Sequence, residues 1–82
     1  MAIILSKHLT DELDSKRLKM PYIEAAITQP DWTQPDRRWI GVTVSFKAIP
    51  EFGNRIIRVA HRLSGTDVFV ITAYWDRGAR RP

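Results

Sequence analysis

The sequence predicts an α+β domain in which two N-terminal helices pack on one face of a three- to four-stranded antiparallel sheet. Two observations predict this class: apolar residues recur at helical spacing in the first third of the chain, and from about residue 38 they alternate with polar residues. Helices that cover one face of such a sheet leave the other face open. We therefore expect any function of the sheet to lie on that open face.

The helical part of the chain divides into two segments. Leu5, Leu9 and Leu13 recur at helical spacing, and Ser6 is a residue type that often caps the start of a helix. This pattern predicts a helix over about residues 6–18 with Ser6 as its N-cap. Pro21 suits the first position of a second helix, because the N–H that proline lacks would be unpaired there. A second proline, at position 30, ends this helix.

The later part of the chain predicts strands. Residues 30–36 contain two prolines and two aspartates, so we expect an irregular connection with a short extended piece around Trp32. Alternation is clearest over about residues 38–47, which predicts a strand with one buried face. Two more strands, over about 55–63 and 66–75, are predicted to form a hairpin joined at Ser64 and Gly65.

Size and charge restrict the possibilities further. With 82 residues, the chain has the length of one domain over 1–82, in which about 77–82 form a flexible basic tail. Residues 1–36 hold four Lys/Arg and six Asp/Glu, and residues 37–82 hold nine and three, so the net charges are −2 and +6. A basic half favours an anionic partner, either nucleic acid or an acidic protein segment.

The apolar start of the chain and its content of metal-binding residues are also informative. The apolar start of the chain is interrupted at once by Lys7 and His8, far short of a signal peptide or the roughly 20 residues that span a bilayer. We therefore expect a cytoplasmic protein without a membrane partner. The chain contains no cysteine and only two histidines, His8 and His61, with no carboxylates clustered among them, so we predict neither a metal site nor a cofactor.

The register of the hairpin decides which polar side chains meet. Alternate side chains of a strand point to opposite faces, so Thr72 and Tyr74 should point together and away from residues 69, 71 and 73. A two-residue turn at Ser64 and Gly65 would place Arg55 opposite Tyr74. A three-residue turn would instead place Arg58 opposite Thr72, and the sequence leaves both registers open.

The order of elements and four segments resemble the BECR nuclease fold, and within it the RelE/BrnT-like toxins. The segments are "SKHLTDEL" and "KMPYIEAAITQPD" in the helices, and "RIIRVAHR" and "VFVITAYW" in the hairpin. The resemblance covers about residues 5–76. It implies a toxin of a toxin–antitoxin system that cleaves RNA without a metal, with an antitoxin protein as partner.

The resemblance also implies roles for individual residues. An arginine holds the scissile phosphate, and a side chain activates the ribose 2′-hydroxyl. His8 could serve as the general acid or base because the reference pKa of histidine is near neutral pH. The catalytic candidates are His8, Arg58, Thr72 and Tyr74, and the candidates for RNA binding are Arg55, Arg62 and Arg77.

Two other interpretations compete with the nuclease. In the first, the domain keeps the fold and the basic face but only binds RNA or an acidic partner, and Arg58 and Arg62 hold no scissile phosphate. In the second, exposed tryptophans and an edge strand pair with a second copy, which makes the chain a homodimer. Charged residues on strands also serve simply to prevent edge-to-edge pairing.

Overall fold

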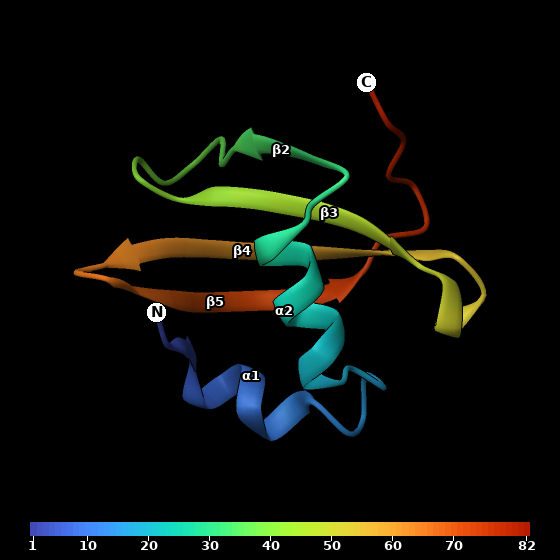
Figure 1. Cartoon of the computed structure of the whole chain (residues 1–82), viewed down its shortest axis with the longest axis horizontal. Helices are drawn as coiled ribbons and strands as arrows, with labels where there is room; N and C mark the ends of the chain where they lie inside the picture. The colour runs from blue at the N-terminus through green and yellow to red at the C-terminus, as the bar shows by residue number, and fades with distance from the viewer.

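The computed structural model describes residues 1–82 and has an α+β fold with a five-stranded mixed sheet (Figure 1). The sheet order is β1-β5-β4-β3-β2; β1 runs parallel to β5, and the other pairs are antiparallel. The predicted α+β class is confirmed, but the predicted antiparallel sheet of three to four strands is wrong. The elements are β1 (Ile3–Leu5), α1 (Lys7–Glu12), α2 (Met20–Thr28), β2 (Trp32–Pro35), β3 (Thr43–Ile49), a 3-10 turn (Pro50–Phe52), β4 (Arg55–Ser64) and β5 (Asp67–Trp75).

Both helices lie on the same face of the sheet, where the larger hydrophobic core forms (Figure 1). Three aromatic rings close one end of this core: Phe52 stacks on Trp75 at 4.2 Å between centroids, and Tyr22 meets Trp75 edge-on at 5.8 Å. The indole N–H of Trp75 donates to the carbonyl of Lys16, which ties the segment after α1 to the last strand. Neither helix is long and apolar enough to cross a membrane.

Helix α1 is shorter than predicted, while α2 agrees with its expected limits. α1 ends at Glu12, and Arg17 then adopts a left-handed backbone conformation with a φ of 56°. This conformation reverses the chain, so that Leu18 returns to the core and its N–H donates to the carbonyl of Leu13. Pro21 stands in the first turn of α2, as predicted.

Strand β1 was not predicted, and it gives Ser6 a second role beside capping. Ile3, Ile4 and Leu5 pair with residues 68–70 of β5, in parallel. Ser6 follows directly: its hydroxyl accepts the N–H of Leu9 at 3.2 Å, which confirms the predicted N-cap, and donates to the carbonyl of Ile71 at 2.9 Å. One side chain therefore fixes the start of α1 against the middle of β5.

Strand β3 begins at Thr43, later than predicted, because residues 36–42 form a turn. The Asp36 carboxylate accepts the N–H groups of Arg38 and Trp39 at 2.7 and 3.0 Å, a typical way for aspartate to initiate a turn. Gly41 has a φ of +84°, a conformation that residues with a side chain rarely adopt. Trp39 and Ile40 therefore stand in solvent instead of continuing the strand.

Neither of the two predicted hairpin registers is correct. The turn residues are Gly65 and Thr66, because Ser64 pairs with Asp67. Pairing then shifts at Ala60 and His61, which face Thr72 and Val70, so that Ile71 is an extra residue in β5. Beyond this β-bulge, Arg58 lies opposite Tyr74. The bulge also changes the face: Phe69 and Ile71 were expected to point away from Tyr74, but lie on its face.

We predict that Ser6→Ala lowers the free energy of unfolding by about 1–2 kcal/mol, because it removes an N-cap and leaves the Ile71 carbonyl without its donor. Urea denaturation measures this change. Ser15→Ala is the matched control: its hydroxyl donates only to the nearby carbonyl of Glu12 at an exposed site, so a loss below about 0.5 kcal/mol is expected. Equal losses for both variants would contradict the second role of Ser6.

Candidate functional site

The face of the sheet opposite the helices, called the open face here, carries a second and smaller hydrophobic cluster. Four buried residues form its centre: Val42, Val44, Phe46 and Ala60. Side chains from β2, from β4, from the bulge in β5 and from the C-terminal segment pack around them: Trp32, Ile56, Ile71 and Ala79. No helix covers these residues, so the open face is accessible although its floor is packed.

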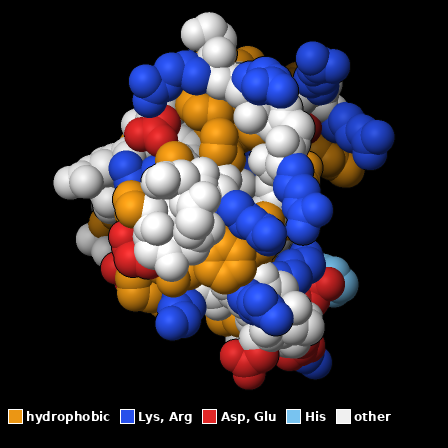
Figure 2. All heavy atoms as spheres, turned by 90° about the vertical axis from the view of Figure 1, so that its right-hand side faces the viewer, with side chains coloured by type: hydrophobic (Ala, Val, Ile, Leu, Met, Phe, Trp, Pro, Cys, Tyr) orange, Lys and Arg blue, Asp and Glu red, His pale blue; other side chains and the backbone are white.

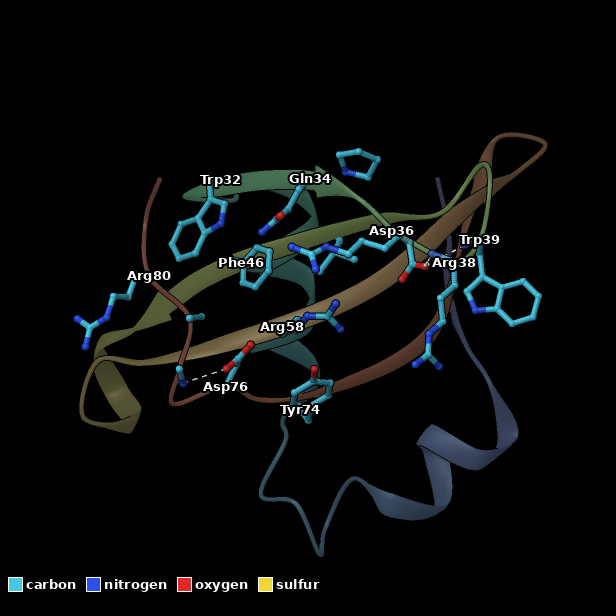
Figure 3. Close-up of a pocket in the computed structure, with 15 residues that line it drawn as sticks. Trp32, Gln34, Asp36, Arg38, Trp39, Phe46, Arg58, Tyr74, Asp76 and Arg80 are labelled. Atoms are coloured by element: carbon cyan, nitrogen blue, oxygen red, sulfur yellow. Dashed lines mark hydrogen bonds between the residues drawn. The ribbon is translucent and has the colours of Figure 1, made fainter.

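Four side chains form a row across the open face, in direct register on four neighbouring strands. Trp32 lies opposite Phe46, Phe46 opposite Arg58, and Arg58 opposite Tyr74. The Trp32 and Phe46 rings stack at 4.7 Å between centroids with a 7° angle between their planes. The Arg58 guanidinium lies over Phe46 at 5.8 Å and over Tyr74 at 5.4 Å from the centroids. Figure 3 shows this open-face row.

The row crosses a pocket of about 620 Å³. One wall is the turn after β2, where Arg38 extends toward the side of β5 and the Trp39 ring lies at the outer edge of the pocket (Figure 3). The opposite wall is the segment that follows β5. Beyond the row, the lining residues that matter for ligand chemistry are Gln34, Asp36, Arg37, Arg38, Trp39, Asp76 and Arg80.

The charge of this pocket is mostly positive and includes a carboxylate held in its ionised form. The N–H of Arg38, which donates to the carboxylate, is the main cause that lowers the pKa of Asp36. Desolvation is the second-largest effect and acts in the opposite direction, while the N–H of Trp39 and the positive charges of Arg58 and Arg38 lower the pKa of Asp36 further. Arg37, Arg38, Arg58 and Arg80 outnumber Asp36 and Asp76, so the lining suits an anion.

Aromatic side chains border the pocket at several places around its rim. Trp39 is 66% exposed in the turn after β2, and Tyr74 is 37% exposed. β1 pairs only with residues 68–70, so no strand lies beside Tyr74 on its outer side. At the other end of the row, the indole N–H of Trp32 is buried without a hydrogen-bond partner.

The four catalytic candidates do not all meet. Arg58 and Tyr74 line the pocket together, and Thr72 lies on the same open face, one row away opposite Ala60. His8 is not in the pocket: it lies on α1 with its side chain 80% exposed, 3.0 Å from Glu12. The structure thus brings together the candidates from the hairpin and leaves the candidate from the first helix apart.

The three arginines predicted to bind RNA lie in different places. The Arg55 guanidinium lies over the Phe52 ring, 5.4 Å from its centroid, at the edge of the core that the helices cover. Arg62 covers Phe69 on the open face, near the hairpin turn. Arg77 is exposed just after β5. Basic side chains surround hydrophobic ones over the end of the molecule shown in Figure 2, so positive charge is not confined to the pocket.

The second histidine, His61, lies on the helix-covered face of the sheet, opposite Val70. His61 Nε2 is 2.7 Å from the hydroxyl of the buried Ser45 on the neighbouring strand. Burial lowers the pKa of His61, so its neutral form is favoured in the folded protein. The pair joins β3 to β4 beneath the sheet and does not reach the pocket.

Sequence reasoning missed half of the open-face row. Phe46 and Trp32 were not among the candidate site residues, because apolar side chains in a strand do not reveal which residues lie beside them. The signal that could have found them is cross-strand register: once Thr43 is known to pair with His61, Phe46 must face Arg58. Asp36 was likewise not a candidate: it belongs to the predicted irregular connection, and its carboxylate accepts two N–H groups of the turn.

Comparison with known proteins did not identify a relative: no family model, curated protein or solved structure matches the chain. Within the structure, no group of three or more His, Asp or Glu side chains is placed to hold a metal ion.

The His61 environment predicts a pH dependence of stability. The unfolded chain takes up a proton on this histidine near pH 6.5, whereas the folded protein takes it up only at lower pH. The free energy of unfolding should therefore fall as the pH decreases below about 6.5, and His61→Gln should reduce this fall. Urea denaturation at pH 7.5 and pH 5.5 measures it, and parallel losses in wild type and variant would contradict the assignment.

Proposed function

We propose that this chain binds single-stranded RNA on the open face of its sheet and cleaves it at a phosphate held by Arg58, as an endoribonuclease toxin of the RelE/BrnT type. The observation that carries the proposal is the meeting of Arg58 and Tyr74 in one accessible, positively charged pocket. The order of the elements and the resemblance of the hairpin segments to such toxins support it further. We expect an antitoxin protein to cover this face in the neutralised complex.

Arg58 is well suited to hold a phosphate. A guanidinium stays charged at any physiological pH and offers N–H donors in one plane, a geometry that matches phosphate oxygens. The rings of Phe46 and Tyr74 lie on either side of it, which restricts the side chain while the edges of the guanidinium stay free to donate. Preorganisation of this kind reduces the entropy lost on binding.

The exposed aromatic rings are suited to hold bases. Stacking of a base on an aromatic side chain contributes roughly 1–3 kcal/mol and tolerates any sequence. Trp39 and the outer face of Tyr74 are both accessible beside the pocket. Bases can stack only after they leave a duplex, so this arrangement favours single-stranded RNA over double-stranded RNA.

The cleavage step requires a proton acceptor near the ribose. The 2′-oxygen attacks phosphorus, its proton passes to a base, and the 5′-oxygen leaves with a proton from an acid, which gives a 2′,3′-cyclic phosphate. We assign the base to Asp36, whose carboxylate lines the pocket with Arg58, and the acid to the Tyr74 hydroxyl. His8 is placed too far from this pocket in the fold to take either role without movement of α1.

One observation favours the second candidate, an RNA-binding module without catalysis. Neither histidine lines the pocket, and the lowered pKa of Asp36 makes its carboxylate a weak base at neutral pH. General acid–base catalysis works best when the pKa of the group lies near the working pH. In this case the same contacts would hold RNA and release it unchanged.

Three variants separate these alternatives, with binding of a labelled single-stranded RNA and its cleavage measured in EDTA. Arg58→Ala should weaken binding and lower cleavage by about 100-fold or more, because it removes the phosphate contact in the transition state. Asp36→Asn keeps an oxygen that accepts the turn N–H groups, so binding should stay equal or tighten while cleavage falls. Arg55→Ala is the matched control, an equal loss of charge on the same strand away from the pocket.

The outcomes differ for each interpretation. Cleavage that falls in Arg58→Ala and Asp36→Asn but not in Arg55→Ala supports the nuclease. Salt-sensitive binding by the wild type with no cleavage supports the RNA-binding module. Equal binding by Arg58→Ala and Arg55→Ala would contradict both, because the open face would then have no special affinity for phosphate.

A further inference from the structure

The chain after β5 folds back beside the open face instead of extending into solvent. The N–H of Asp76 donates to the carbonyl of Ile56, and the Asp76 carboxylate accepts the N–H of Gly78 at 3.0 Å. From this turn the chain runs across the ends of the strands toward β2, where the C-terminus lies (Figure 1). Residues 77–82 are called the strap here. A flexible tail was expected for these residues because they have no apolar face.

Two contacts hold the strap in place. Ala79 packs on the hydrophobic cluster of the open face, the cluster that contains Phe46. Near its end, an Arg81 guanidinium nitrogen lies 3.6 Å from a carboxylate oxygen of Asp31. Asp31 itself is well fixed, since its other carboxylate oxygen accepts the N–H of Ala48 at 2.8 Å. The strap is thus tied to the start of β2, directly before Trp32.

The contacts that hold the strap against the rest of the protein are weak. The Arg81 side chain is 67% exposed, and an exposed ion pair contributes little because water and salt screen it. Ala79 is a small side chain and buries little surface. Trp32 lines the same pocket, and its indole N–H is buried without a hydrogen-bond partner while the strap is in place. The strap should therefore open readily.

We propose that the strap is an autoinhibitory lid that competes with RNA for the Trp32 end of the pocket and opens when Arg81 leaves Asp31. The proposal rests on the proposed function for its ligand, and on the strap contacts for its mechanism. Gly78, Ala79 and Arg80 form the wall of the pocket at this end. RNA that displaces them brings acceptor atoms that can receive the Trp32 indole N–H, a bond that the closed strap does not supply.

Arg81→Gln tests the lid, because it removes the ion pair and keeps an uncharged polar side chain that is shorter than arginine. The first measurement, hydrogen exchange of the Trp32 indole N–H followed by NMR, does not depend on RNA. The second is the affinity for a short single-stranded RNA. Lys7→Gln is the matched control, an equal loss of charge at an exposed position of α1.

A lid predicts that Arg81→Gln exchanges the Trp32 indole faster and binds RNA up to about fivefold more tightly, although it has lost a positive charge. Lys7→Gln should leave exchange unchanged and bind no more tightly than the wild type. Unchanged indole exchange in Arg81→Gln would overturn the lid, and so would weaker RNA binding, which would make Arg81 an RNA contact. Faster exchange with no RNA binding by any variant would reject the RNA ligand and its regulation, and leave only a mobile strap.

Discussion

The β-bulge at Ile71 is the feature on which the candidate site depends. Counted back from the Gly65–Thr66 turn without a bulge, Arg58 would lie opposite Ala73, and Tyr74 would point beneath the helices. The extra residue changes the face of every later side chain in β5. It therefore buries Val68 and Val70 before the bulge and Ala73 after it in one core, and sends Tyr74 to the open face beside Arg58.

The bulge is connected to the rest of the fold through Ser6. Its hydroxyl donates to the carbonyl of Ile71 and accepts the N–H of Leu9, one of the N–H groups in the first turn of α1 that have no partner within the helix. Strand β1 delivers Ser6 to this place by pairing with the three residues of β5 that precede the bulge. The parallel edge strand, the helix cap and the register of the hairpin thus depend on one another, although they are far apart in sequence.

Local pattern predicted a large part of this fold. The second helix with Pro21 in its first turn, the Ser6 cap and the two long strands of the hairpin all follow from residues close in sequence. The parts that were wrong need information from distant residues. β1 has only three residues and pairs with the far end of the chain, and nothing in "VFVITAYW" marks Ile71 as an extra residue. The turn of residues 36–42 overrode an alternating pattern, because Asp36 and Gly41 favour a turn there.

Some residues of the candidate site could be predicted from the sequence, but their arrangement could not. Arg58 and Tyr74 could be chosen as polar residues of a strand, but their meeting depends on the bulge. Phe46 and Trp32 complete the open-face row and are apolar, so they give no signal of function before the register is known. His8 was chosen by resemblance alone, and the fold keeps it on an exposed turn of α1. A row built from four strands is a property of the sheet and not of any one segment.

The central claim is that the open-face row forms the surface that binds RNA, and NMR titration with a short single-stranded RNA tests it most directly. The account predicts that chemical-shift changes concentrate on the backbone of residues 46, 58 and 74, on the Arg58 Nε–H and on the Trp39 indole. It also predicts that these changes weaken as salt is added. Changes confined to α1 and α2, or to Arg55 on the other face of β4, would contradict the account.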